Sequence, residues 1–385
     1  MELASPWFLS EPRPVYPQLS STINVETAVI GGGIAGVMTA YALAKAGQSV
    51  ALVEQAYIGS GATGWTTAFL TYVTDETLPA LETRFGKNVA RAAWESGRQA
   101  IGEIERIVIK EKIDCDFRRC PAFIFAENED DRARLIAEGR VYKAEGFAAE
   151  FENSGLPFAP LGHLRVDGQA VFDPIKFIRT IVKRASERGA NIFENTPVSG
   201  ITNATRWKIK TPHGEIQADN VVVATYRPLE ALNALCPKPV SKVTYVLEAE
   251  IVPGILPEAI YWDLREPYNY FRVDRSEKHD RIFLGGEDQS TEDSSAGEMR
   301  FKGLADFLGN ILLRETPTIR RKWSGEILET ADGLPYIGET ANKGIYIATG
   351  FAGNGMTYGA LSSSAISGSI LGRPEPWAEI YRLNR

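Results

Sequence analysis

The sequence predicts a mixed α/β fold (α+β in layout) of two domains, in which a Rossmann-like nucleotide-binding domain is interleaved with an antiparallel-sheet domain. Its 385 residues suffice for about two domains. A strand–glycine loop–helix–strand pattern fills residues 25–54, and a fully apolar strand of the parallel-sheet kind follows at 218–225. Residues 240–323 instead alternate apolar and polar side chains in short runs, which is typical of antiparallel sheet.

The first pattern carries a specific nucleotide signature. Gly31, Gly33 and Gly36 form G-x-G-x-x-G directly after the strand, where they permit a tight turn, a close approach of backbone to a pyrophosphate, and close helix–strand packing. Gly47 ends the helix, and Glu54 ends the second strand at the position of an acceptor for ribose hydroxyls. Because a 2′-phosphate would be repelled by Glu54, we expect an unphosphorylated adenosine diphosphate group.

The remaining elements follow in order. Residues 58–71 form a loop of Gly, Ser and Thr whose small donors would reach a pyrophosphate. Apolar side chains at helical spacing in residues 77–112 predict one long helix or two abutting ones. A strand at 115–126 and a polar helix at 127–146 precede a helix capped by Asp173, with Pro174 at its first position. A strand at 190–195 and a hairpin at 207–216 then lead to the apolar strand.

The later chain completes both domains. A helix at 298–314 closes the antiparallel region, and strands at 332–338 and 344–350 precede a small-residue helix at 355–371. We assign residues 23–112, 169–237 and 326–385 to the nucleotide-binding domain. Residues 113–168 and 238–325 form the second domain. Residues 1–22 hold four prolines and predict an extended arm on the surface.

Composition excludes several classes of function. A net charge of −7 and a pI near 5.3 argue against nucleic acid as a partner. No apolar run is long enough for a transmembrane segment, and the N-terminus lacks the basic and apolar parts of a secretory signal. Cys115, Cys120 and Cys236 are few and odd in number, which favours reduced thiols and a cytoplasmic location. Without a further His or Cys cluster we expect no metal site.

Several motifs together carry a family resemblance. They are VETAVIGGGIAG with Glu54, the loop GSGATGWTTA, the strands YNYFRVD and RIFLGGED, the W-S-G at Trp323, and DGLPYIGE, IATGFAGNGMTYG and PWAEIY. In this order they resemble the flavin-dependent superfamily of D-amino-acid oxidase, glycine oxidase and sarcosine oxidase. Members resembling γ-glutamylputrescine oxidase, and those fused to a Rieske domain, look most similar. Rieske-fused members continue beyond the tail, whereas this chain stops at Arg385, so we expect no such module.

The resemblance implies FAD as the cofactor. It would be held by the three glycines and Glu54, lie along residues 61–67, place its adenine on the backbone of Val198, and meet residues 353–357 with its pyrimidine edge. The last stretch precedes a helix whose N-terminal amides would stabilise negative charge on the flavin, and a plain N-cap by Asn354 is the alternative. The cofactor-binding candidates are Gly31, Gly33, Ile34, Ala35, Gly36, Glu54, Gln55, Gly61, Ala62, Thr63, Thr66, Thr67, Val198, Ala224, Thr225, Gly353, Asn354, Gly355, Met356 and Thr357.

Three departures from the family pattern refine the expectation. Trp65 stands where relatives with a covalent flavin carry His, and no Cys follows Cys236, so we expect non-covalent FAD. Amino-acid oxidases clamp the substrate carboxylate with the Arg of a W-x-G-x-R pattern, but here Ile327 takes that place, which favours an amine. The Lys that activates oxygen in sarcosine oxidases is absent near residues 281–286, so oxygen, a quinone or a carrier protein remains open as electron acceptor.

The expected reaction is oxidation of a small-molecule amine at its C–N bond, by hydride transfer to flavin N5 and hydrolysis of the resulting imine. The sequence nominates no catalytic acid or base. Substrate-pocket candidates are Arg272, Tyr270, Trp65, Phe351 and Trp323. Arg272 is the first choice for an anionic substrate group, with an ordinary strand Arg as the alternative. Competing functions are an amino-acid oxidase, a flavin monooxygenase, and a structural or electron-transfer subunit that holds FAD without catalysis.

Overall fold

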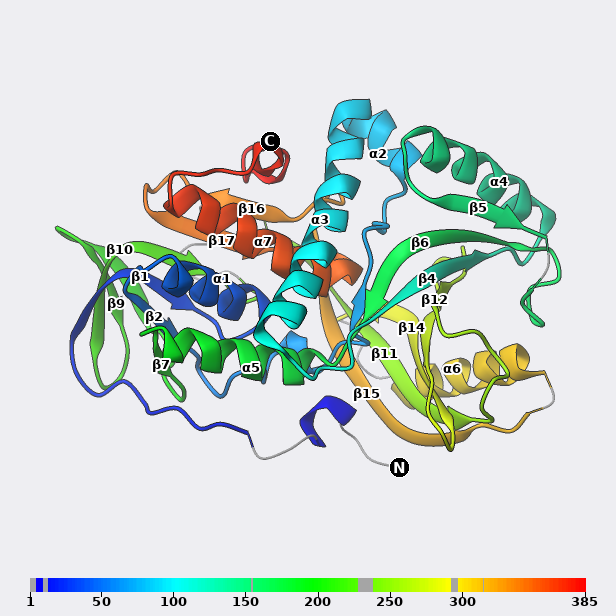
Figure 1. Cartoon of the computed structure of the whole chain (residues 1–385), viewed down its shortest axis with the longest axis horizontal. Coiled ribbons are helices and arrows are strands. Elements are labelled where there is room, and N and C mark those ends of the chain that lie inside the picture. Colours follow the sequence, from blue (N-terminus) through cyan, green and yellow to red (C-terminus); the bar gives the residue numbers. More distant parts are fainter. Residues whose placement is uncertain (1–4, 10–12, 154, 228–237, 292–296, 314) are drawn as a thin grey trace.

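The computed structural model describes residues 5–9, 13–153, 155–227, 238–291, 297–313 and 315–385. Two sheets organise them, as predicted. In Figure 1 the strands of one sheet lie on the left and those of the other on the right. The long helix α3 (Lys87–Glu111) packs on elements of both, since it contacts α7 (Gly355–Ile370) and strand β6 (His163–Val171).

The first sheet has eight strands and forms the nucleotide-binding half. Its central strands are parallel, because β10 (Glu215–Val223) pairs with both β1 (Ile23–Ile30) and β17 (Ile345–Thr349), and β1 pairs with β2 (Val50–Val53). The remaining strands are β7 (Asn191–Phe193), β16 (Tyr336–Glu339), β8 (Gly200–Asn203) and β9 (Trp207–Lys210). The β9–β10 pair is the predicted hairpin. Helices α1 (Ile34–Lys45), α5 (Pro174–Glu187) and α7 belong to this half, where α1 contacts both of the others.

The second sheet has nine strands in the order β15-β11-β14-β13-β12-β4-β6-β3, with β5 beside β6. Their bounds are β3 (Phe69–Leu70), β4 (Arg118–Phe125), β5 (Ala149–Glu152), β11 (Val240–Ile251), β12 (Ile260–Trp262), β13 (Tyr270–Asp274), β14 (Asp280–Ser290) and β15 (Thr318–Glu329). All pairings are antiparallel except β4 with β12, where two distant segments join edge to edge. Helix α6 (Gly297–Leu312) contacts β11 and β14, and α4 (Glu129–Ala144) contacts β5 and β6.

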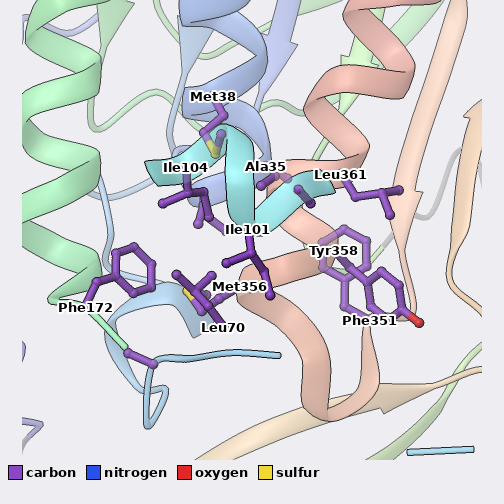
Figure 2. Packing of buried hydrophobic residues seen from close by; sticks show 14 of the residues in the cluster. Ala35, Met38, Leu70, Ile101, Ile104, Phe172, Phe351, Met356, Tyr358 and Leu361 are labelled. Atoms are coloured by element: carbon purple, nitrogen blue, oxygen red, sulfur yellow. The ribbon is translucent and has the colours of Figure 1, made fainter. Parts of the chain in front are cut away.

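An apolar core between the helices of the first half supports the N-terminal end of α7. That end belongs to the candidate functional site described below. Figure 2 shows buried side chains of three helices and of β3 in contact: Ala35 and Met38 of α1, Ile101 and Ile104 of α3, Met356, Tyr358 and Leu361 of α7, and Leu70. Burial of this kind is worth about 1.5–3 kcal/mol for each large apolar side chain. The first turn of α7 therefore packs against a buried apolar core that holds it in place.

Local signals predicted several element ends correctly. Asp173 caps α5, because its Oδ1 accepts the amides of Ile175 and Lys176, both at 2.9 Å. Of the two alternatives at residues 77–112, the chain adopts two helices, α2 (Leu78–Phe85) and α3, separated at Gly86 with φ +85°.

The sheets cross the predicted domain boundaries in three places. Phe69–Leu70 forms β3, the end of β6 extends through Val171, and the end of β15 reaches Glu329, so these stretches of the predicted nucleotide-binding domain pair within the second sheet. In the case of β6, the strand is nine residues long and continues past the expected boundary at residue 169. Cys236 and Arg314 lie outside the described residues.

The N-terminal arm is not confined to the surface, which corrects the sequence expectation. The short 3₁₀ helix η1 (Pro6–Leu9) inserts Trp7, whose side chain is buried. The Trp7 indole N–H donates to the carbonyl oxygen of Thr66 at 2.7 Å, and its ring stacks on Phe283 at 5.2 Å. Local proline content predicted an extended chain but not this long-range anchor.

We expect Trp7→Ala to lower the free energy of unfolding by about 3–5 kcal/mol, because it empties a large buried site. The matched control is Leu9→Ala, which removes an exposed side chain of the same turn and should change stability by about 0.5 kcal/mol or less. Urea unfolding midpoints measure both. Equal small effects would show that the arm does not anchor on the core.

Candidate functional site

A cavity of about 1070 Å³ lies between the two sheets. Its lining runs from the glycine loop after β1, past the loop 60–67 and the start of α7, to the strands β13, β14 and β15. Ligand pockets of ordinary size hold about 300–1,000 Å³. The cavity therefore has room for a dinucleotide together with a small substrate.

The three glycines play distinct roles at one end of the cavity. A Cβ on Gly31, whose φ is +111°, would lie 2.3 Å from the carbonyl oxygen of Ala224. A Cβ on Gly36 would lie 2.0 Å from the carbonyl oxygen of Gly31. Both positions therefore require glycine for packing of β1 against its neighbours. Gly33 is more open, since only the Oγ1 of Thr63 comes within 4 Å of a Cβ built there, at 3.1 Å, and it lines the cavity.

Glu54 lies at the same end and is held in place by backbone amides. Its Oε2 accepts the N–H of Gly32 at 2.7 Å, and its Oε1 accepts the N–H of Ala56 at 2.9 Å. The side chain is half-buried and lines the cavity. The carboxylate is thus fixed beside the glycine loop, where it can accept hydroxyl donors from a ligand.

The N-termini of two helices face the cavity. Neither α1 nor α7 has a side-chain cap from its N-cap residue, and Gly33, Ile34, Gly355 and Met356 line the cavity. The amide side chain of Asn354 instead donates to the carbonyl oxygen of Val73 at 3.0 Å, so the alternative of a plain N-cap by Asn354 is wrong. In α1 the Ile34 amide donates to Oγ1 of Thr63 at 3.0 Å. The remaining first-turn amides and the helix dipoles favour negative charge, as on a pyrophosphate or an electron-rich ring.

Most predicted site residues come together on this cavity. The lining includes Gly31, Gly33, Ile34, Ala35, Glu54, Gln55, Gly61, Ala62, Thr63, Thr66, Thr67, Val198, Ala224, Thr225, Gly353, Asn354, Gly355 and Met356, together with the pocket candidates Trp65, Tyr270, Trp323 and Phe351. Gly36 and Thr357 do not line the cavity but support residues that line it. Thr357 does so by donating its hydroxyl to the carbonyl oxygen of Thr71 at 2.9 Å.

Arg272 does not line this cavity, which speaks against its prediction as a contact for an anionic substrate group. Its side chain is 2% exposed. One nitrogen, Nη1, donates to the carbonyl oxygens of Thr67, Ala68 and Phe172 at 3.0–3.2 Å, and Nη2 pairs with Asp274 at 2.6 Å. The side chain therefore fixes the loop that forms one wall of the cavity.

Three aromatic candidates shape the second-sheet end. The Trp323 indole N–H donates to the carbonyl oxygen of Trp65 at 2.8 Å, which ties β15 to the loop 60–67. The Tyr270 hydroxyl lies 3.1 Å from Oγ1 of Thr244. Aromatic rings and a few hydroxyl groups therefore line this end of the cavity.

Sequence reasoning missed two carboxylates at this end. Asp75 and Asp288 line the cavity, as do Tyr268 and Thr244. Burial raises the pKa of Asp288 to about 6, and the hydroxyl of Thr244 opposes that rise. Burial also raises the pKa of Asp75, partly offset by the Gly353 amide. Asp75 is solvent-accessible through the cavity, yet protein surrounds it. Asp288 ends the RIFLGGED motif and Asp75 follows a different strand, so only the fold shows that both line one cavity.

His and Cys side chains in the cavity, metal sites and membrane-crossing helices are all missing from the described part of the chain. No His or Cys of that part lines the cavity, and it contains no group of three or more His, Cys, Asp or Glu side chains arranged for a metal ion. Among the same residues, no helix combines the length and apolarity that a membrane crossing requires.

Comparison with known proteins gives the following relationships. A family model described as "FAD dependent oxidoreductase" (DAO) matches residues 26–367. A putative Rieske 2Fe-2S iron-sulfur protein, YhfW of Bacillus subtilis, is 28% identical over 98% of this chain and 75% of its own length. A glycine oxidase of Bacillus licheniformis is 27% identical over 94% of this chain and 97% of its own. The crystal structure of glycine oxidase from Geobacillus kaustophilus aligns with a TM-score of 0.79 at 20% identity, over 94% of this chain and 99% of that one.

Proposed function

Because this chain belongs to the DAO family of FAD-dependent oxidoreductases, we propose that it oxidises an amine at its C–N bond with non-covalent FAD held in the cavity between the sheets. The family match and the related oxidases support an FAD-dependent amine or amino-acid oxidoreductase. The observation that carries the finer proposal is the meeting of the glycine loop, Glu54 and two helix N-termini on one large cavity.

The residues at the first end fit an adenosine diphosphate. Glu54 would accept the ribose hydroxyls, and the open backbone at Gly33, with the α1 N-terminus, would face the pyrophosphate. The α7 N-terminus, at Gly353 to Met356, would stabilise negative charge on the pyrimidine edge of the ring. Neither His nor Cys, the two side chains that would make the covalent links considered above, is found among the described lining residues.

When bound, FAD supplies a two-electron acceptor whose N5 takes a hydride from the carbon beside a neutral amine nitrogen, and the resulting imine hydrolyses. The chain's own residues bind and orient the substrate and exclude water. Trp65, Trp323 and Tyr270 provide apolar walls, and Ile327 also lines the cavity.

The lining favours an amine over a simple amino acid. A carboxylate substrate needs a free cation, but every cation among the described lining residues already has an acidic partner. Arg134 pairs with Glu138, Arg227 with Glu326, and Lys322 with Glu298. Arg265 pairs with Glu127.

Anaerobic flavin reduction tests the proposal. FAD-loaded protein is mixed without oxygen with a panel of primary amines, secondary amines and amino acids, and the loss of the oxidised flavin spectrum is followed. We expect amines to reduce the flavin and α-amino acids to reduce it at least tenfold more slowly. Rapid reduction by NADPH alone would favour a monooxygenase, and no reduction by any compound would favour a non-catalytic subunit.

A further inference from the structure

We infer that Asp288 and Asp75 form an anchor for a cationic group of the substrate, so that the preferred substrate is a diamine or polyamine rather than a monoamine. This inference rests on the proposed amine oxidation and specifies its substrate class. It concerns the second-sheet end of the cavity, away from the glycine loop.

The cavity lining carries more acidic than basic side chains. Its described residues include seven carboxylate side chains and four cationic ones, and all four cations are paired with acids. Asp288 and Asp75 form no ion pair with any cation in the described ranges. Buried or enclosed carboxylates without a cation are costly unless a partner compensates them. A cationic ligand would provide that partner.

Asp288 carries the stronger evidence of a missing partner. Its Oδ1 is shielded from solvent and accepts no hydrogen bond from the described residues. By contrast Asp263, another carboxylate of the lining, accepts the backbone and side-chain amides of Asn269 at 2.9 and 3.0 Å. Asp263 therefore stabilises a turn, whereas one oxygen of Asp288 is left for a donor that the described residues do not supply.

Aromatic rings surround the two aspartates in a way that suits a cation. The hydroxyl of Tyr268 lies 3.5 Å from Oδ1 of Asp75, and the rings of Tyr268 and Tyr270 are 5.6 Å apart. Tyr270 in turn contacts Thr244, the neighbour of Asp288. Tyrosine faces attract ammonium groups in addition to the carboxylates. Lys242, whose charge acts on Asp288, is already paired with Glu329 at 2.8 Å.

The anchored cation is distinct from the reacting amine. Neighbouring carboxylates favour the protonated form of an amine, and a protonated nitrogen has no lone pair to expel a hydride from the adjacent carbon. The group held by the aspartates must therefore be a second charged group of the same substrate. Two cationic centres separated by a short chain define a diamine or polyamine.

Matched substrates test the inference in anaerobic flavin reduction. We expect 1,4-diaminobutane to exceed butylamine by tenfold or more in the second-order rate constant for reduction. Asp288→Asn should remove this preference by lowering the rate constant for 1,4-diaminobutane to that for butylamine. Glu287→Gln is the matched control, since Glu287 is the adjacent residue, does not line the cavity, and pairs with Arg300. Asp75→Asn should weaken the preference in the same direction.

Binding of non-oxidisable probes provides a readout independent of catalysis. Methylguanidinium and N-methylurea have nearly the same shape, but only the first is charged. In calorimetry on FAD-loaded protein, we expect methylguanidinium to bind at least tenfold more tightly, and Asp288→Asn to abolish the difference. Equal binding of both probes, or a difference unchanged in Asp288→Asn, would overturn the inference.

The two experiments separate the possible failures. If no amine reduces the flavin but methylguanidinium binds through Asp288, the proposed oxidation fails and the cation anchor stands. If amines reduce the flavin without preference for the diamine, and neither probe depends on Asp288, the oxidation stands and the anchor is overturned.

The pH dependence of probe binding has a defined sign. Only ionised Asp288 attracts a cation, and its pKa is raised to about 6. The groups facing it are Thr244 and Lys242 of β11, Glu329 of β15, Tyr270 of β13, and Asp75. We expect methylguanidinium affinity to fall about tenfold per pH unit below pH 6 and to level off above it. N-methylurea binding should not change over this range, and parallel curves for both probes would contradict the assignment.

Discussion

Replacing Gly36 with alanine is expected to give protein that no longer retains FAD and unfolds at a lower urea concentration. The new Cβ would lie 2.0 Å from the carbonyl oxygen of Gly31 and 3.1 Å from its carbon. That peptide cannot yield easily, because its N–H, which belongs to Gly32, donates to Oε2 of Glu54 at 2.7 Å. Helix α1 must therefore move away from β1, which costs about 1–3 kcal/mol or more by overpacking.

The same displacement would carry the α1 amides and Gly33 away from the cavity. We expect the affinity for FAD to fall at least tenfold, as measured by calorimetry on flavin-free protein. Gly61→Ala is the matched control, because Gly61 also lines the cavity, has φ −82°, and has no atom within 4 Å of a built Cβ. That variant should bind FAD within about threefold of the parent. Loss of FAD from both variants, or from neither, would contradict the packing argument.

Replacing Arg272 with methionine is expected to lower the free energy of unfolding by about 3–5 kcal/mol. Removal of one partner leaves the buried Asp274 carboxylate undercompensated, and the carbonyl oxygens of Thr67, Ala68 and Phe172 lose their donor. The second substitution Asp274→Asn in the same protein should restore part of the loss, since it removes a buried charge whose remaining partners, Arg118 at 3.1 Å and Arg281 at 3.7 Å, are partly exposed.

Urea unfolding distinguishes this structural role from substrate binding. Arg106→Ala is the control, because Arg106 forms a half-exposed ion pair with Glu103 on α3 and should cost about 1 kcal/mol or less. If Arg272→Met kept parental stability and only raised KM for the substrate, the sequence-based prediction of a substrate contact would be right and the structural role wrong.

The parts of the fold that the sequence predicted are those encoded by near neighbours. The strand–turn–helix at Gly31 to Gly36 depends on glycines within six residues of one another, and Asp173 caps a helix that starts at the next residue. Such short-range signals can be recognised without knowledge of the rest of the chain. For the same reason most of the predicted cofactor residues, which flank strand and helix ends, lie on one cavity.

The errors arise from contacts between distant segments. Two-residue periodicity placed Tyr270 and Arg272 on one strand face, but it did not reveal that Trp7 and the loop at Thr67 cover Arg272, whereas Tyr270 lines the cavity. Asn354 has the right position for a local cap, yet its side chain bonds to Val73, 281 positions away. Asp75 and Asp288 come from a loop and a strand of different regions, and no spacing rule joins them.

The most direct test of the account is the flavin content of the purified protein and the way in which the flavin is released. The account predicts about one FAD for each chain, recovered intact in the supernatant after heat or acid denaturation and identified by its mass. Protein that stays colourless after incubation with excess FAD, or flavin that remains attached to the denatured chain, would contradict it.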